Sequence, residues 1–298
     1  MTYVKGANGN ILMTGATGFL GSNLLQALVD REMFVVILKR SFSDINRIKY
    51  LMDKVVFFDL DKTSIEEVFK KTRVNVILHC ATDYGRKNND PLPVIEANLT
   101  LPLKLLDAGK KNNISCFINA DTFLDKRINY YSLSKQQFKE WLSLYSRHLT
   151  CVNMILEHFY GPFDDKTKFV SFVLDKLLSN ASYIDLTAGG QKRDFIFIRD
   201  VVAAFIKVLE NFAVLKRGVH NFEIGTEVQT GIKDFVNLAR KLSANNSTKL
   251  NFGVLPYREN EVMEARVDTK ALRSLGWAPE YSLEEGLRET IAAERNIK

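Results

Sequence analysis

The sequence predicts an α/β protein whose first part is a doubly wound parallel sheet and whose second part is a smaller mixed α/β domain. Short apolar runs of strand length alternate with helical patterns through the first half of the 298-residue chain. The runs are apolar on both faces, as strands covered by helices on both sides are. The alternation loosens after the turn at 160–164. We therefore expect one domain over 1–163 plus about 195–224, and a second over about 164–194 plus 225–298.

Each element of the first half follows from its pattern of apolar residues. The predicted strands are 11–13, 34–38, 55–58, 74–78, 115–119 and 152–156. The predicted helices between them are 19–29, 64–71, 93–111 and 132–147. In the second part we expect helices near 169–178, 200–212, 232–242 and 269–275. Parallel sheets of this kind bind ligands at the carboxyl ends of their strands.

Composition excludes several classes of protein. Apolar residues make up 46% and charged residues 26%, which is typical of a globular enzyme and not of a disordered or fibrous chain. The net charge of +6 is compatible with an anionic ligand, but no basic run exceeds two residues, so we expect no nucleic-acid partner.

The cysteines and the N-terminus bear on location. Cys80, Cys116 and Cys151 are odd in number, far apart and set in apolar runs, so we expect buried free thiols and no metal site. Residues 1–10 lack an apolar signal core, and no apolar run is long enough to span a bilayer. We expect a cytoplasmic protein with no membrane partner.

A glycine-rich loop follows the first predicted strand. In Thr14-Gly-Ala-Thr-Gly-Phe-Leu-Gly21, the three glycines permit a tight turn, a close approach of the backbone to a pyrophosphate, and close packing of the helix on the strand. The helix N-terminus offers unpaired N–H groups to that pyrophosphate. This strand–loop–helix context favours a Rossmann-type dinucleotide site over a ligand-free turn. The predicted contacts in the loop are Gly15, Thr17, Gly18, Phe19 and Leu20.

The end of the second predicted strand indicates which dinucleotide is bound. An NAD site usually places an acidic residue here for the ribose 2′-hydroxyl, but this chain has Lys39-Arg40-Ser41. Cations suit a 2′-phosphate, so NADPH is favoured over NAD(H), unless these residues are only a solvated loop. Asp59 and Leu60 end the third strand, where the carboxylate either meets the adenine amino group or caps the loop locally.

A tyrosine and a lysine follow the fifth predicted strand. Tyr131 and Lys135 are four residues apart, so a helix places them on one face. A neighbouring ammonium lowers the pKa of a phenol, which suits Tyr131 for acid–base catalysis. The same lysine can hold the nicotinamide ribose.

These motifs together resemble the extended short-chain dehydrogenase/reductase family, in its nucleotide-sugar branch. Further matches are His79-Cys-Ala81, Asn98, the stretch 193–201 and the C-terminal stretch 275–286. The resemblance places Cys80 and Ala81 in the cofactor site. Residues 81–85, 156–162 and 257–262 are most similar to nucleoside-diphosphate 4-keto-6-deoxyhexose reductases, such as abequose and paratose synthases, which act on CDP-linked sugars.

The resemblance also implies a set of substrate-binding residues. They are Thr82, Tyr84, His158, Phe169, Arg193, Arg258 and Glu261. Most of the branch has Asn at position 158, and the histidine is either a sugar or phosphate contact or a core residue. Arg258 matches the arginine that grips the diphosphate, and Arg193 is the second candidate. The alternative for both arginines is a surface ion pair, of Arg258 with the flanking Glu259 or Glu261, and of Arg193 with the adjoining Asp194.

One position departs from the family pattern. The Ser or Thr that usually bonds the substrate oxygen falls on Ala120, and Thr122 lies two residues on, on the same face of a continuing strand. We expect Thr122 to supply the missing hydroxyl, unless it only ends the strand. The Asp–Glu pair of the family's 4,6-dehydratases is incomplete, with Asp121 and Thr122 in its places, which disfavours dehydration.

The expected activity is NADPH-dependent reduction of the C4 ketone of a nucleoside-diphosphate 4-keto-6-deoxy or 3,6-dideoxy hexose, for surface polysaccharide synthesis (O-antigen of lipopolysaccharide). Tyr131 is the expected proton donor, Lys135 its partner and Thr122 the group that orients the carbonyl. The alternatives are an NAD-dependent 4-epimerase and a non-catalytic NADP(H)-sensing regulator. The sequence leaves open CDP or dTDP as carrier, the configuration at C4, and a homodimer.

Overall fold

The computed structural model describes residues 10–86 and 90–296, which form two compact units. Unit 1 comprises the chain up to Leu156 together with Val202–Phe222 and Ser274–Gly276. Unit 2 comprises Glu157–Val201, Glu223–Arg273 and the chain from Trp277 onward. Residues 1–9, on which the expectation about a signal peptide mainly rests, lie outside the described part.

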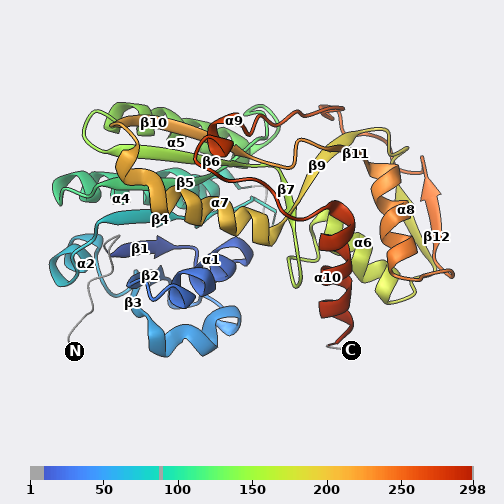
Figure 1. The fold of residues 1–298 in the computed structure, drawn as a ribbon, viewed down its shortest axis with the longest axis horizontal. Helices are drawn as coiled ribbons and strands as arrows, with labels where there is room; N and C mark the ends of the chain where they lie inside the picture. Colours follow the sequence, from blue (N-terminus) through green and yellow to red (C-terminus); the bar gives the residue numbers. More distant parts are fainter. Residues whose placement is uncertain (1–9, 87–89, 297–298) are drawn as a thin grey trace. The chain divides into compact units, whose positions relative to one another are not determined.

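A seven-stranded sheet forms the centre of unit 1, in the order β10-β6-β5-β4-β1-β2-β3 (Figure 1). All neighbouring pairs among the strands β1 to β6 are parallel: β1 with β2 and β4, β2 with β3, β4 with β5, and β5 with β6. This confirms the predicted fold class. The strands are β1 (Ile11–Thr14), β2 (Val35–Lys39), β3 (Val56–Asp59), β4 (Val76–His79), β5 (Cys116–Thr122), β6 (Thr150–Leu156) and β10 (Gly218–Ile224).

Helices cover both faces of this sheet. The helical segments are α1 (Phe19–Asp30), η1 (Asn46–Lys54), α2 (Ile65–Lys71), α3 (Pro91–Ile95), η2 (Glu96–Thr100), α4 (Leu101–Lys111), α5 (Tyr130–Tyr145), α7 (Ile198–Asn211) and η3 (Phe212–Val214). One apolar core joins α2, α4 and α5 to the sheet, around Phe69, Leu105 and Phe138. In Figure 1, α7 crosses in front of the central strands. Burial of these apolar side chains is the main force that holds the unit together.

The predicted helix over 93–111 is divided by the π-helical turn η2, between α3 and α4. Pro102 has no N–H, and in a regular α-helix its ring would collide with the carbonyl of Asn98. Widening the turn relieves that collision, so Leu101 N donates to Glu96 O, five residues back. The wider turn holds Asn98, whose side chain is fully buried. Such turns are frequent at functional sites.

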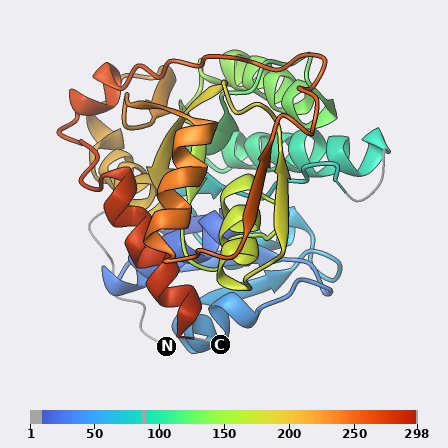
Figure 2. The ribbon, with the colours of Figure 1, turned by 90° about the vertical axis from the view of Figure 1, so that its right-hand side faces the viewer.

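Unit 2 contains two small sheets and a layer of helices. A three-stranded sheet has the order β11-β9-β7, and β12 pairs with β8. Figure 2 shows α6, α8 (orange) and α10 (red) side by side. The strands and helices are β7 (His158–Tyr160), β8 (Tyr183–Leu186), β9 (Lys192–Phe197), β11 (Gln229–Gly231), β12 (Lys249–Phe252), α6 (Phe169–Leu178), α8 (Ile232–Leu242), α9 (Lys270–Arg273) and α10 (Leu283–Arg295).

The unit boundaries differ from those expected from the sequence. The sequence analysis grouped 157–163 and 195–201 with the first domain, but in the structure they belong to unit 2. The reason is strand pairing: β7 and β9 pair with each other in register, His158 beside Phe195, rather than with the large sheet. The two strands therefore form the centre of unit 2.

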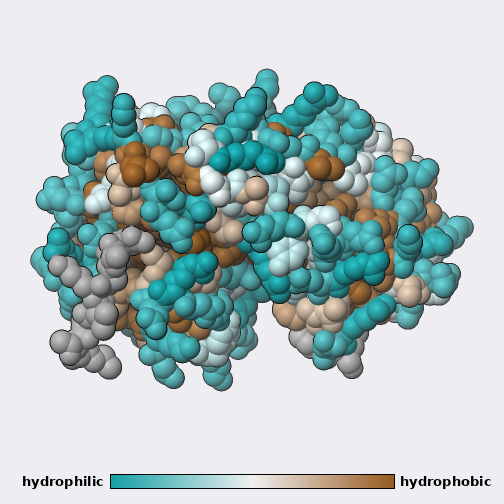
Figure 3. All heavy atoms as spheres, in the orientation of Figure 1, coloured by the Kyte–Doolittle hydropathy of each residue, from teal (hydrophilic) through white to brown (hydrophobic). Residues whose placement is uncertain are grey.

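No helix in the described ranges is long and apolar enough to cross a membrane. The face drawn in Figure 3 is largely hydrophilic, with apolar side chains in small groups.

Candidate active site

The glycine loop of unit 1 has the shape that a dinucleotide requires. Gly15 has φ +70°, and a Cβ there would collide with the backbone nitrogen of Ala81. A Cβ on Gly21 would collide with the carbonyl of Gly15. At Gly18, in contrast, a Cβ would meet only the Gly15 oxygen, at 3.4 Å. Gly18 is also the N-cap of α1 and provides no side-chain acceptor, so the helix N-terminus can receive an anion.

A buried threonine and histidine fix this loop to the end of β4. The Thr14 hydroxyl accepts from Ala81 N at 3.2 Å and lies 2.8 Å from His79 Nδ1. His79 is fully buried, and burial holds its pKa well below the ordinary value, so the ring is neutral. The matched residues His79 and Ala81, through their contacts with Thr14, therefore connect the ends of β1 and β4 and the loops that follow them.

The end of β2 brings the predicted 2′-phosphate residues together with two carboxylates. The ammonium of Lys39 lies 5.6 Å from the centre of the Phe57 ring, and Arg40 stacks on Phe42. The Ser41 hydroxyl donates to Asp59 Oδ2 at 2.7 Å, and this bond is the main reason that the pKa of Asp59 is lowered. Asp59 therefore makes the local contact that was one of its two expected roles.

Asp61 and Leu60 complete this turn. Asp61 Oδ2 accepts from Ser41 N at 2.8 Å, and Leu60 N donates to Lys39 O at 2.8 Å. The turn at the end of β2 thus brings two cations, Lys39 and Arg40, together with two acids, Asp59 and Asp61.

Tyr131 lies in the first turn of α5, which begins where Asn129 and Ser132 form a capping box. The Tyr131 ring packs against Tyr84, with ring centres 4.9 Å apart. Burial raises the pKa of Tyr131, Tyr84 adds to the rise, and a hydrogen bond with Thr122 opposes it. Thr122 thus reaches the phenol from the end of β5. The other residues predicted for the cofactor site also lie in unit 1: Thr17 in the glycine loop, Leu20 in the first turn of α1, and the half-buried Cys80 after β4.

The pKa of the Tyr131 phenol is raised, and not lowered as the sequence analysis expected. The sequence analysis expected Lys135 to lower the pKa of Tyr131, but burial dominates and Lys135 is not among the groups that shift it. The Lys135 ammonium donates to Ala120 O at 2.8 Å and is 2% exposed. Burial lowers the pKa of Lys135, and Asp121 opposes that change. In this state the lysine is bound to the strand end.

The loop after β4 is held by the amide of Asn98. Its Oδ1 accepts from the Thr82 hydroxyl at 3.0 Å and from Asp83 N at 2.8 Å. Its Nδ2 donates to Asp83 O and to the Ser134 hydroxyl. Ser134 belongs to α5, so this one side chain fixes both Thr82 and the helix that carries Tyr131. Asn98 was matched by resemblance alone, and its bonding explains why an amide is needed.

Unit 2 holds the other predicted substrate residues. His158 Nδ1 lies 3.1 Å from Glu157 Oε1, and Phe169 packs on Phe235. Arg193 forms a buried ion pair with Glu261 and also donates to the carbonyls of Lys192 and Val262. Arg193 is thus paired with an acid, but that acid is Glu261 and not the adjoining Asp194 of the expected alternative.

Arg258 lies three residues before Glu261 in the same turn, with Glu261 N donating to Arg258 O at 3.1 Å. Its side chain is exposed and makes no ion pair with any residue that the structure describes. Because Arg193 anchors Glu261 and Val262, the turn that presents Arg258 is held in place.

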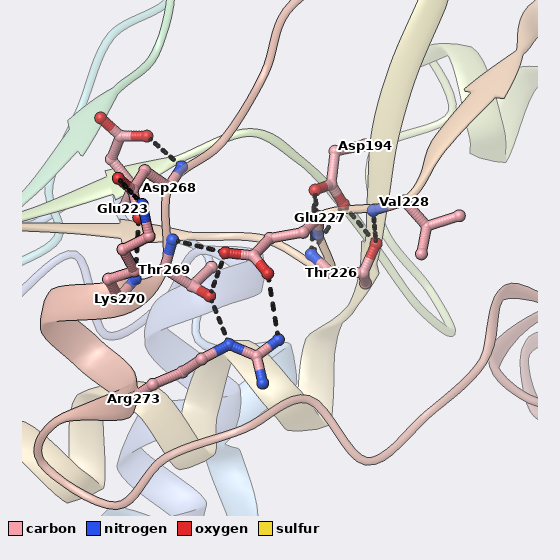
Figure 4. Close-up of polar contacts among 9 residues, drawn as sticks. All are labelled: Asp194, Glu223, Thr226, Glu227, Val228, Asp268, Thr269, Lys270 and Arg273. Carbon is pink, nitrogen blue, oxygen red and sulfur yellow. Dashed lines mark hydrogen bonds and ion pairs between the residues drawn. The ribbon is translucent and has the colours of Figure 1, made fainter.

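Sequence reasoning missed a polar network in unit 2 (Figure 4). Asp194, 1% exposed, accepts from Thr226 N, the Thr226 hydroxyl and Glu227 N. Glu227 in turn accepts from Thr269 and Arg273. The only signal was the position of Asp194 inside the matched stretch 193–201, since the partners lie more than 30 residues away.

A dinucleotide loop at the N-terminus of α1, with a buried Tyr-x-x-x-Lys pair at the carboxyl edge of the same parallel sheet, defines a nicotinamide-dependent enzyme of the short-chain dehydrogenase/reductase type. Residues 11–225 match the model of the NAD dependent epimerase/dehydratase family. The chain belongs to this family.

Several curated relatives are named as nucleotide-sugar enzymes. The chain is 33% identical to CDP-abequose synthase of Salmonella typhimurium over 98% of its own length and 99% of the relative's. It is 32% identical to the enzyme of the same name from Salmonella muenchen, over 96% and 98%. A putative UDP-glucose 4-epimerase of Methanocaldococcus jannaschii is 26% identical over 94% and 97%. The predicted resemblance is thereby confirmed.

Solved structures confirm the fold. A UDP-glucuronic acid 4-epimerase from Bacillus cereus, solved with UDP-glucuronic acid and NAD, has a TM-score of 0.84 at 24% identity, covering 97% of this chain and 100% of that one. A UDP-N-acetylglucosamine 4-epimerase from Methanobrevibacter ruminantium has a TM-score of 0.85 at 20% identity, over 99% and 100%.

Proposed function

We propose that this protein is an NADPH-dependent reductase of the C4 ketone of a nucleoside-diphosphate 4-keto-6-deoxy or 3,6-dideoxy hexose. The observation that carries the proposal is the contact between the Thr122 hydroxyl and the buried Tyr131 phenol at the end of β5. It supplies the hydroxyl that is missing at Ala120. The two CDP-abequose synthases support the substrate class, since they match over nearly the whole chain.

The glycine loop and the end of β2 fit the cofactor. Gly15 and Gly18 would receive the pyrophosphate at the N-terminus of α1, and Lys39 and Arg40 would face the 2′-phosphate. When bound, NADPH supplies the hydride that the carbonyl carbon receives.

Tyr131 is the general acid in this proposal. Burial raises the pKa of its phenol, so the group stays protonated at neutral pH, as a proton donor to an alkoxide must. Thr122 bonds the same oxygen and orients the carbonyl. Lys135, released from Ala120 O, would hold the nicotinamide ribose and place a positive charge near the phenolate that forms.

Anchoring of the carrier nucleotide is assigned to unit 2. Arg258 suits a diphosphate because a guanidinium can bind two phosphate oxygens at once. Binding energy from this remote part of the substrate then positions the reacting carbon. The product would be a nucleotide-linked deoxysugar for surface polysaccharide synthesis.

A second candidate is a 4-epimerase that retains NAD, and one observation favours it. Asp59 and Asp61 both bond Ser41 at the end of β2, so two carboxylates lie where a 2′-phosphate would bind. Carboxylates suit a ribose 2′-hydroxyl and repel a phosphate. Lys39 and Arg40 at the same turn favour the reductase.

The test follows absorbance at 340 nm while NADPH or NADH is mixed with the enzyme and CDP- or dTDP-linked 4-keto-6-deoxy sugars. We expect rapid loss of NADPH with one carrier. Tyr131→Phe should reduce kcat by about 10²–10⁴-fold while NADPH binding, followed by fluorescence, is retained. Conversion of 4-hydroxy sugars by retained NAD, with no NADPH consumption, would support the epimerase. Unchanged turnover in Tyr131→Phe would overturn the mechanism.

A further inference from the structure

A row of polar side chains crosses one face of the large sheet in unit 1. Strands β1, β4, β5 and β6 each contribute one side chain that is at most 1% exposed, and these four residues are in-register neighbours, so they leave the same face. The edge strand β10 adds a fifth, which is exposed. We call these residues the polar row: Thr14, His79, Asn119, Asn153 and Asn221.

Hydrogen bonds join the polar row at both ends but not at its centre. The Thr14 hydroxyl lies 2.8 Å from His79 Nδ1. Asn119 Nδ2 donates to Asn153 Oδ1 at 3.0 Å, and Asn153 Nδ2 donates to Asn221 Oδ1 at 3.1 Å. At the centre, His79 Nε2 and Asn119 Oδ1 are buried and have no hydrogen-bond partner among the residues that the structure describes. A buried polar atom without a partner costs about 1–3 kcal/mol, so two on neighbouring residues require an explanation.

The bonding of Thr14 determines which nitrogen of His79 carries the proton. Burial keeps the imidazole neutral by lowering its pKa, so one nitrogen donates and the other accepts. The Thr14 hydroxyl accepts from Ala81 N at 3.2 Å, and in the described ranges the acceptor for its own proton is His79 Nδ1. Nε2 therefore bears the ring hydrogen. The unpartnered atom of His79 is thus a donor, and that of Asn119 is an acceptor.

We propose that one buried water molecule bridges His79 Nε2 and Asn119 Oδ1, and that the continuous row formed in this way positions the dinucleotide loop. A water molecule accepts from Nε2–H and donates to the amide oxygen, so it satisfies both atoms at once. Phe117 and Phe138 flank the imidazole, each with its ring centre 6.1 Å away, and all three rings are fully buried. The water is therefore enclosed and part of the fold.

The dinucleotide loop is the segment that the polar row holds. Bonds at both ring nitrogens fix the imidazole, because a ring turned over would place carbon atoms against Thr14 and the water. With its proton given to His79, the Thr14 oxygen stays directed at Ala81 N. The loops after β1 and β4 are thereby held together, where a Cβ on Gly15 would lie only 2.4 Å from Ala81 N. This role is the same for NADPH and for NAD.

The first test needs the wild-type protein alone. In protein carrying isotope-labelled histidine, nitrogen NMR distinguishes a protonated from an unprotonated ring nitrogen, and the signals absent from His79→Gln identify this residue among the four histidines. We expect Nε2 protonated and Nδ1 unprotonated at neutral pH. A high-resolution crystal structure should show a water within hydrogen-bond distance of both atoms. A proton on Nδ1, a direct bond between His79 and Asn119, or no water between them would overturn the site.

Two substitutions of His79 test the positioning role. His79→Gln keeps an acceptor for Thr14 and a donor for the water, whereas His79→Phe fills the space of the ring and keeps neither. We expect His79→Phe to raise the Kd of whichever of NADPH and NAD binds more tightly by about fivefold, which corresponds to the loss of one hydrogen bond, and His79→Gln to stay within about twofold of the wild type. Calorimetry measures both values.

Asn221→Ala is the matched control, because it removes only the exposed end of the same row and should change neither the protonation of His79 nor the Kd. A wild-type Kd in His79→Phe, or equal losses in His79→Phe and His79→Gln, would overturn the positioning role. If His79→Phe does not fold, Thr14→Val, which loses the hydroxyl, is compared with Thr14→Ser, which keeps it, and the same outcomes apply. No sugar takes part in these measurements, so their failure would leave the proposed reductase untouched.

Discussion

Two buried aspartates, one in each unit, differ in the number of hydrogen bonds that their carboxylates accept. Asp194 in unit 2 is 1% exposed and receives hydrogen bonds from two backbone N–H groups and one hydroxyl. Asp121 in unit 1 is 5% exposed and receives one, from Thr122 N at 2.8 Å. Burial raises the pKa of both carboxyls. A buried carboxylate is stabilising only when its oxygens accept hydrogen bonds. Asp194 therefore stabilises the folded state, and Asp121 destabilises it.

The location of Asp121 explains why such a residue is tolerated. It lies between Ala120, which binds Lys135, and Thr122, which binds Tyr131. Its charge raises the pKa of Lys135 against the effect of burial. Asp121 therefore opposes the effect of burial on the pKa of Lys135, although burial of its own carboxylate is unfavourable. Asp194 thus holds a loop by accepting hydrogen bonds from its backbone, whereas Asp121 acts on the pKa of Lys135.

The largest effect that this comparison predicts is on stability in unit 2. Asp194→Ala leaves the N–H groups of Thr226 and Glu227 without their acceptor, so we expect the free energy of unfolding to fall by about 3–5 kcal/mol. Urea denaturation followed by circular dichroism measures the change. Asp194→Asn, which keeps one carbonyl acceptor, should lose about half as much. If Asp194→Ala lowers the free energy of unfolding by less than about 1 kcal/mol, Asp194 does not stabilise the fold more than Asp121 does.

A smaller, pH-dependent effect is expected at Asp121. Because the folded state raises the pKa of this carboxyl from its ordinary 3.8, its contribution to stability is full below about pH 4 and is lost as pH rises through the folded value. Asp121→Asn does not titrate at this position, so its stability relative to the wild type should increase with pH between about 4 and 7. Urea denaturation at several pH values tests this. A relative stability that falls over this range would contradict it.

The smallest effect is expected at the edge of the Asp194 network. Arg273 and Glu227 are 43% and 37% exposed, and their ion pair at 3.3 Å is screened by solvent. Arg273→Gln should change the free energy of unfolding by less than about 1 kcal/mol, and less still at high salt. A loss as large as that of Asp194→Ala would mean that the network depends on its exposed end.

Prediction from sequence succeeded where local pattern determines structure. The alternating apolar runs predicted the first six strands of the large sheet but not β10, and the glycine spacing located the loop before α1. Tyr131 and Lys135 were found because helical spacing places them on one face. Each of these depends on residues close together in the chain.

Two of the failures arise where segments distant in the sequence pack together. Residues 157–163 and 195–201 were grouped with the first domain because register with a partner, not composition, decides which sheet a strand joins. The pKa of Tyr131 was misjudged because burial by Tyr84 and β5 outweighs the neighbouring lysine. Helix α10 was not expected, although Ser282 and Glu285 form a capping box at its start.

The π-helical turn at η2 has a consequence for how this chain can vary in length. A π turn contains one residue more than the α-helical turn that it replaces. Deleting one residue within 96–100 would restore the regular helix and rotate everything before it by about 100° relative to α4. The amide of Asn98 would then leave both Thr82 and Ser134. Homologous chains should therefore exchange residues here freely at exposed positions but rarely gain or lose one. An alignment gap in this segment would mark a protein in which the loop after β4 is built differently.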